Sequence, residues 1–184
     1  LKNVNTVVWS TEWQRDIFAP AYGLTVSKLF IVENYYGPKE QAFAPEKKNF
    51  LAGTRPLQWK NDARLAEAFS LVAEVGESVL YDNTTKPFEA FMDTVSRAYA
   101  VILVSFGDIS PNLILDAIRH NKPFIVTKET GLYERIKPCA LFVDPENVKD
   151  IALKIQWLSD PTNYNEQRKK VEAFNFLHTW EDIA

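Results

Sequence analysis

The sequence has few of the residues that crosslink small domains or bind metals. Its 184 residues include one cysteine, Cys139, one methionine and two histidines. A single cysteine excludes an intramolecular disulfide and a thiolate metal cluster, so we expect Cys139 to be a small buried hydrophobe. We expect His120 and His178 to be packing or surface residues, and we expect no bound metal.

The sequence also lacks long apolar runs and a large excess of charge. No stretch approaches the roughly 20 apolar residues that a membrane-spanning helix needs. A formal net charge of −3 gives no reason to expect a nucleic-acid partner. The opening LKNVNTVVWS has neither a basic leader nor the apolar core of a signal peptide, so we expect a cytoplasmic protein. Because it also lacks an initiator methionine, we expect a piece of a longer parent.

Short apolar runs alternate with amphipathic stretches along the chain. The predicted strands are 6–9, 29–32, 49–52, 78–81, 100–104, 123–126 and 140–143, and the predicted helices are 60–72, 88–99, 111–120, 148–158 and 163–174. Strands that are apolar on both faces and alternate with helices indicate βαβ units. The sequence therefore predicts an α/β fold with a doubly wound parallel sheet.

The irregular, charged stretch ENYYGPKEQAFAPEKK, residues 33–48, interrupts this pattern. We expect residues 1–28 to be the last strand and helix of a preceding N-terminal domain or hinge, and residues 29–184 to form the main domain. In a doubly wound sheet, ligands bind at loops that follow the carboxyl ends of the strands. Three such loops carry candidate site residues.

The first loop brings two cations to the mouth of the sheet. Gly53 permits a sharp turn after the strand, and Arg55 and Lys60 follow before the next helix. Two cations there suit an anion such as a diphosphate, which arginine can bind through two hydrogen bonds. The simpler interpretation is a solvated loop with incidental charges.

The second loop, SFGDISPNLILDA, carries two acids and a helix start. Ser110 is a suitable N-cap, and Pro111 suits the first helical position. The free amides of Asn112 and Leu113 would then favour an anion. Asp108 would lie above that anion, and Asp116 would share a helix face with Asn112. The alternatives are a turn-forming Asp108 and an exposed Asp116 paired with His120.

The third loop follows the strand that ends near residue 126. Its Gly131 permits close approach of the backbone to a ligand, and Thr130 could cap a short helix that includes Glu134. Alone, this loop is a weak signal. The three loops gain weight from their order along the chain.

Together they resemble the C-terminal, donor-binding half of the group-1 family of retaining glycosyltransferases, which have GT-B architecture with two Rossmann-like domains. SFGDISPNLILDAIRHNKPFIV resembles the family signature of an acid, seven residues and a second acid, followed by Ala and by Lys-Pro before the next strand. The Arg-x4-Lys spacing of Arg55 and Lys60 resembles its phosphate-binding pair, and Thr130, Gly131 and Glu134 resemble its later glycine turn and glutamate. WSTEWQRDIFAPAYGLTVSKLFIVEN and FVDPENVKDIALKIQWLSDP resemble its hinge-side and C-terminal segments.

The resemblance implies transfer of a sugar, with retention, from a nucleoside diphosphate to an acceptor hydroxyl, as in polysaccharide biosynthesis. Asp116 would bind the ribose hydroxyls, Asp108 would face the donor sugar, and Arg55 and Lys60 would neutralise the diphosphate. Amides rather than a metal would assist the cations. The donor site would be completed by Gly53, Ser110, Asn112, Leu113, Thr130, Gly131 and Glu134.

The acceptor would be bound by the missing N-terminal domain, through which the parent could also associate peripherally with a membrane. We expect the fragment alone to bind the donor without transferring the sugar. Both signature acids are Asp, one methylene shorter than the usual Glu. That difference leaves open a non-catalytic nucleotide-sugar-binding module and, less favoured, a nucleotide-sugar 2-epimerase-like isomerase.

Overall fold

A five-stranded parallel sheet forms the centre of the protein, as a computed structural model shows for residues 6–24, 29–52, 57–74 and 79–183. Its strands are β3 (Asn49–Leu51), β4 (Leu80–Asp82), β5 (Ala100–Leu103), β6 (Phe124–Thr127) and β7 (Leu141–Val143). Their order is β4-β3-β5-β6-β7. The direction of winding reverses between β3 and β5, and this switch point is where a doubly wound sheet binds its ligand.

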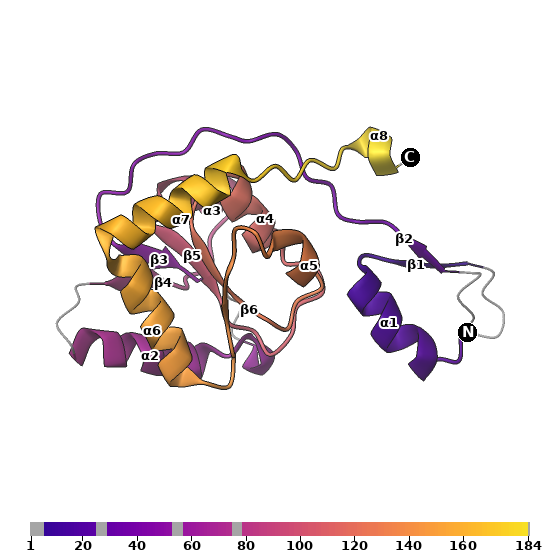
Figure 1. Cartoon of the computed structure of the whole chain (residues 1–184), viewed down its shortest axis with the longest axis horizontal. Coiled ribbons are helices and arrows are strands. Elements are labelled where there is room, and N and C mark those ends of the chain that lie inside the picture. Colours follow the sequence, from indigo (N-terminus) through magenta and orange to yellow (C-terminus); the bar gives the residue numbers. More distant parts are fainter. Residues whose placement is uncertain (1–5, 25–28, 53–56, 75–78, 184) are drawn as a thin grey trace.

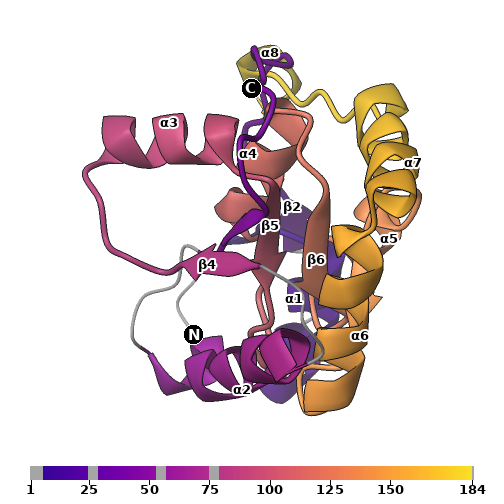
Figure 2. The ribbon, with the colours of Figure 1, turned by 90° about the vertical axis from the view of Figure 1, so that its left-hand side faces the viewer.

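Helices cover both faces of the sheet (Figure 2). The helices of the first core are α3 (Phe88–Arg97), α4 (Asn112–Arg119) and α5 (Tyr133–Ile136), and those of the second core are α2 (Asp62–Glu74) and α6 (Val148–Ser159). Helix α7 (Pro161–Ala173) contributes Val171 to the first core and Tyr164 to the second. Along β5, Val101 and Leu103 enter the first core, whereas Ala100 and Ile102 enter the second. Burial on both faces explains why the strands are continuously apolar.

The N-terminal residues form a separate small unit beside the main sheet (Figure 1). Strand β1 (Val7–Trp9) is followed by α1 (Glu12–Ala21), and β2 (Leu29–Ile31) returns to pair with β1 in parallel. Thr11 caps α1 by accepting a hydrogen bond from the amide of Gln14 at 3.1 Å. The predicted division after residue 28 falls between these two paired strands, and β2 belongs to the small sheet.

Residues 32–48 are irregular, as predicted, and several hydrogen bonds hold them against the main domain. The Glu40 amide donates to the Arg119 carbonyl at 2.8 Å. The ammonium of Lys122 donates to the Phe43 carbonyl at 2.7 Å. Lys122 is almost fully buried, and burial lowers its pKa to about 8.

All seven predicted strands and all five predicted helices are present, with ends shifted by a few residues. The predicted break between the last two long helices falls at Asp160, whose carboxylate accepts from the amides of Thr162 and Asn163 to cap α7. Cys139 is buried, as predicted, and burial raises its pKa to about 12. A further short helix, α8 (Trp180–Ile183), ends the described chain.

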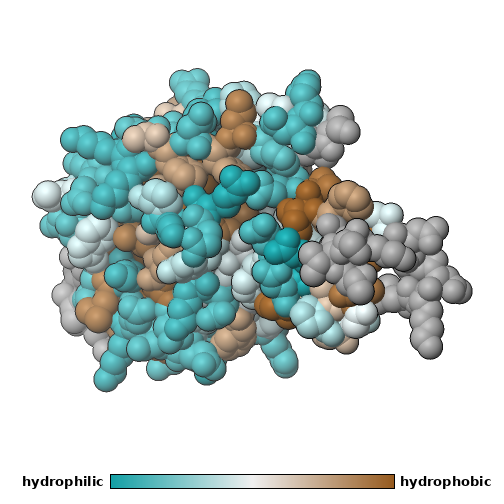
Figure 3. Space-filling view, turned by 45° about the vertical axis from the view of Figure 1, so that its right-hand side comes forward, coloured by the Kyte–Doolittle hydropathy of each residue, from teal (hydrophilic) through white to brown (hydrophobic). Residues whose placement is uncertain are grey.

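The surface in Figure 3 is largely hydrophilic, and its apolar side chains appear as small separate patches. Two of the exposed apolar residues, Trp180 of α8 and Tyr35 of the connecting segment, stack with ring centroids 4.9 Å apart. Within the four described ranges, no helix has both the length and the apolar character required to cross a membrane.

Candidate functional site

Lys60 and Asp108 meet at the switch point of the sheet. Lys60 ends the short 3-10 helix η2 (Gln58–Lys60), which precedes α2, and Asp108 lies in the loop after β5. The Lys60 ammonium lies 2.7 Å from the Asp108 carboxylate, and their side chains are 16% and 14% exposed. The first and second predicted loops are therefore adjacent. Gly53 and Arg55 lie outside the described residues.

The start of α4 opens onto a pocket of about 290 Å³, which we call the α4 pocket. The first backbone hydrogen bond of the helix runs from the Ile114 amide to the Pro111 carbonyl at 3.0 Å, so the amides of Asn112 and Leu113 have no acceptor within the helix. The pocket is lined by Leu57, Trp59, Lys60, Leu103, Asp108, Ser110, Pro111, Asn112 and Leu113. The Lys60 cation, its Asp108 partner and the start of α4 thus line a single pocket, and a cation beside a helix N-terminus suits an anion.

Ser110 does not cap α4, so that prediction is wrong. Pro111 occupies the cap position without a side-chain hydrogen bond. The Ser110 hydroxyl instead accepts from Asn34 Nδ2 at 3.0 Å, and the same amide donates to Asn112 Oδ1 at 3.1 Å. Asn34, which follows β2, therefore joins the connecting segment to the rim of the α4 pocket. Asn34 was not predicted from the sequence, because its two hydrogen bonds span more than seventy positions.

Asp116 is partly buried on α4, and this desolvation raises its pKa to about 6. The alternative pairing with His120 is not found: the His120 ring bonds the Gln41 carbonyl at 3.2 Å. Asp116 is also not among the residues that line the pockets of about 290, 600 and 890 Å³. Its role toward ribose remains a prediction. No ion pair of Asp116 is found within the described ranges, and a partly buried carboxylate of this kind is unusual for a purely structural residue.

The third loop is joined to the second by backbone hydrogen bonds. The Asp108 amide donates to the Glu129 carbonyl at 2.9 Å, and the Gly131 amide donates to the Asp108 carbonyl at 3.0 Å. A Cβ on Gly131 would overlap the Ile109 carbonyl oxygen and lie 2.5 Å from Thr11 Oγ1. Glycine is therefore required here by contacts within the chain itself, and Asp108 is the residue at which all three loops meet.

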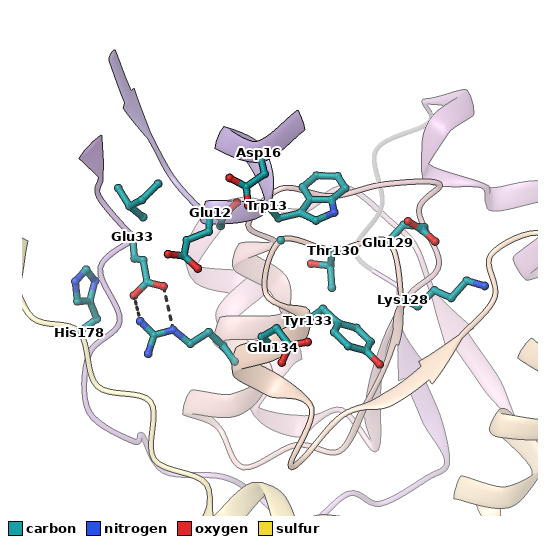
Figure 4. A pocket seen from close by; sticks show the side chains of 14 residues that line it. Glu12, Trp13, Asp16, Glu33, Lys128, Glu129, Thr130, Tyr133, Glu134 and His178 are labelled. Carbon is teal, nitrogen blue, oxygen red and sulfur yellow. Dashed lines mark hydrogen bonds and ion pairs between the residues drawn. The ribbon is translucent and has the colours of Figure 1, made fainter. Parts of the chain in front are cut away.

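Thr130, Gly131 and Glu134 line a larger pocket of about 890 Å³ between α1 and the third loop. In Figure 4, the carboxylates of Glu12 and Glu134 border this pocket, and a dashed pair joins Glu33 to an arginine, Arg135. The short helix predicted around Glu134 is present as α5. Thr130 is buried and accepts from the Leu132 amide at 3.3 Å, so it forms a turn before α5 and does not cap it.

A third pocket, of about 600 Å³, shares residues with both others. It shares Trp59, Asp108 and Ser110 with the α4 pocket, and Trp13 with the larger one. Neither Trp13 nor Trp59 was predicted to belong to the site. The position of Trp59 directly before Lys60 was the available signal. Among the described residues, no group of three or more His, Cys, Asp or Glu side chains is placed to hold a metal ion.

The fold has known relatives, although the sequence matches no family model and no curated protein. Sucrose-phosphate synthase from Thermosynechococcus elongatus superposes with a TM-score of 0.71 and 17% identity, covering 100% of this chain and 56% of that one. Anabaena HepE, in complex with UDP and glucose, superposes with a TM-score of 0.72 and 13% identity, covering 93% and 57%. A variant of S. aureus TarM, in complex with fondaparinux, alpha-GlcNAc-glycerol and UDP, superposes with a TM-score of 0.71 and 16% identity, covering 95% of this chain and 42% of that one.

These structures are GT-B glycosyltransferases, and the chain has the Rossmann-like fold of their C-terminal half. The fold predicted from the three loops is therefore confirmed. The chain spans less than three fifths of the length of each of the three proteins. At such low identities the likeness establishes the fold alone.

Proposed function

We propose that the chain is the donor-binding half of a glycosyltransferase and binds a nucleoside-diphosphate sugar at the switch point. The observation that carries the proposal is the α4 pocket, where the Lys60 ammonium and the free amides of Asn112 and Leu113 converge. The diphosphate would occupy this pocket, with Arg55 as a second cation. The structural relatives HepE and TarM, whose structures hold UDP, support a nucleotide as the ligand of this fold.

Asp108 has a double role in this proposal. In the free chain its carboxylate forms an ion pair with the Lys60 ammonium. A diphosphate would replace the carboxylate as the partner of Lys60, and Asp108 would then be available to a sugar hydroxyl in the adjoining 600 Å³ pocket. Asp116 would bind the ribose, and Thr130, Gly131 and Glu134 would border the sugar from the third loop.

In the parent, the sugar would pass to an acceptor hydroxyl with retention. Lys60 and the α4 amides would stabilise the negative charge that develops on the diphosphate leaving group. In this proposal they do so without a metal ion. The acceptor would be bound largely by the half of the parent that this chain does not contain, so the chain alone binds the donor but does not transfer it.

Isothermal titration calorimetry of the chain with UDP and GDP tests the proposal. We expect one of the two to bind, and Lys60→Ala to weaken that binding by about tenfold, because a charge-assisted contact to phosphate contributes about 1.5 kcal/mol. Lys170→Ala is the matched control, since Lys170 pairs with Glu166 on the exposed face of α7. Binding unaffected by Lys60→Ala, or no binding of either nucleotide, would contradict the proposal.

A further inference from the structure

Asn61 has an unusual backbone conformation directly after Lys60. Its φ of 65° and ψ of 34° place it in the left-handed region, where it ends η2 and precedes α2. Glycine and asparagine adopt this conformation at lower cost than other residues. Its side chain is nonetheless not needed for the turn, because glycine would form it too. The side chain therefore calls for a separate explanation.

The side-chain amide of Asn61 joins the ends of two strands. The residue is only 4% exposed, and all of its polar groups are hydrogen-bonded within the chain. Its Nδ2 donates to the Val104 carbonyl at 3.0 Å, directly after β5, and to the Pro145 carbonyl at 2.7 Å, two residues after β7. Its Oδ1 accepts from Arg64 at 3.3 Å. An aspartate carboxylate at neutral pH and a leucine side chain have no N–H to donate to these two carbonyls, so neither could replace the asparagine.

These bonds hold the backbone next to Lys60, the residue whose ammonium would bind the phosphate. Lysine is a flexible side chain, and each ordered rotamer costs conformational entropy. The backbone of η2 is held to the second loop from both sides: the Phe106 amide donates to the Trp59 carbonyl at 2.9 Å, and Asn61 bonds Val104. Lys60 lies between these attachments, with its ammonium 4.1 Å from the Trp59 ring centroid.

We propose that Asn61 is a positioning residue for phosphate binding, whose side-chain amide holds Lys60 at the α4 pocket. This inference rests on the proposed function, because it assigns Asn61 a role through Lys60. The side chain reaches the chain ends that follow β5 and β7, and the second loop that follows β5 also carries Asp108. Asn61 thereby keeps the Lys60 cation in register with the free amides of α4. If Asn61 only stabilised the fold, its replacement would lower the stability of the chain and would not act on nucleotide binding through Lys60.

A double-mutant cycle on nucleotide binding separates these roles. We expect Asn61→Gly, which retains the turn and removes the amide, to raise the Kd for UDP or GDP by about three- to tenfold. In a Lys60→Ala background the same substitution should change Kd by less than about twofold, because the residue it positions is gone. Asn121→Gly is the matched control: Asn121 also has a positive φ, of 53°, and its side chain bonds Lys39.

The outcomes distinguish this inference from the proposed function. If Lys60→Ala leaves nucleotide binding unchanged, the proposed function fails, and the inference fails with it. If Lys60→Ala weakens binding but Asn61→Gly does not, or if Asn61→Gly weakens it equally in both backgrounds, only the positioning role is overturned. Should Asn61→Gly be unfolded by circular dichroism, the same cycle is measured with Asn61→Ser, and the same criteria apply. Faster hydrogen exchange of the Phe106 amide in Asn61→Gly is the expected ligand-free sign of a loosened η2.

Discussion

Replacing Gly131 with alanine tests whether the second and third loops meet the N-terminal unit as closely as described. The added methyl group would overlap the Ile109 carbonyl oxygen, lie 2.5 Å from Thr11 Oγ1 and lie 3.1 Å from Thr11 Cβ. The residue cannot easily shift away, because its amide bonds the Asp108 carbonyl at 3.0 Å. Overpacking of this kind costs about 1–3 kcal/mol. For a domain of this size, that corresponds to a fall in melting temperature of about 3–10 °C.

Gly107→Ala is the control, since Gly107 lies next to Asp108 on the same loop. A methyl group there would meet only the Glu129 carbonyl oxygen, at 4.0 Å, and the residue does not have a positive φ. Such a substitution commonly stabilises by about 0.4–1 kcal/mol through the unfolded chain. Thermal unfolding of both variants, followed by far-UV circular dichroism in one buffer, gives the comparison. Equal melting temperatures for the two would refute the close packing at Gly131.

Three further substitutions test charges. Burial raises the pKa of Asp116 to about 6, so its ionised carboxylate destabilises the folded chain above that pH. Asp116→Asn should therefore stabilise the chain by about 1 kcal/mol at pH 7.5, allowing for partial exposure, and should have almost no effect near pH 4. Urea unfolding at the two pH values measures the difference. Burial lowers the pKa of Lys122 to about 8, so its contribution to the free energy of unfolding rises from pH 8 toward 10.5. Between pH 7.5 and 9.5, the free energy of unfolding of the unsubstituted chain should rise by about 1–2 kcal/mol relative to that of Lys122→Met. A difference that stays constant with pH would contradict this. Asp108→Asn should tighten UDP or GDP binding by about threefold, because it releases Lys60; weaker binding would show that Asp108 does not compete with phosphate.

The fold was predictable because local patterns specify it. Runs such as Ala100–Leu103 are apolar on both faces, and this pattern depends only on the covered parallel sheet. Pro161 after Asp160 predicted the helix break for the same local reason. The pairing of β2 with β1 was not predicted, because strand pairing depends on contacts between residues twenty positions apart.

The site was predictable at the level of loops and less so at the level of individual side chains. Sequence placed Lys60, Asp108 and the start of α4 at strand ends, and the structure brings these three together. It assigned Ser110 to a cap, whereas a distant residue, Asn34, takes that hydroxyl. The structural role of Asn61 was also missed, although an asparagine between a lysine and a helix start is a recognisable signal for a left-handed turn.

Backbone amide chemical shifts during titration with UDP or GDP test the central claim most directly. The claim is that a nucleoside diphosphate binds at the switch point, with its phosphates in the α4 pocket. We predict that the largest shifts in a ¹⁵N-labelled chain fall on Lys60, Asn112 and Leu113, and that Lys60→Ala reduces them at equal nucleotide concentration. Shifts confined to the larger pocket around Tyr133, or no shifts at saturating concentrations of both nucleotides, would contradict the claim.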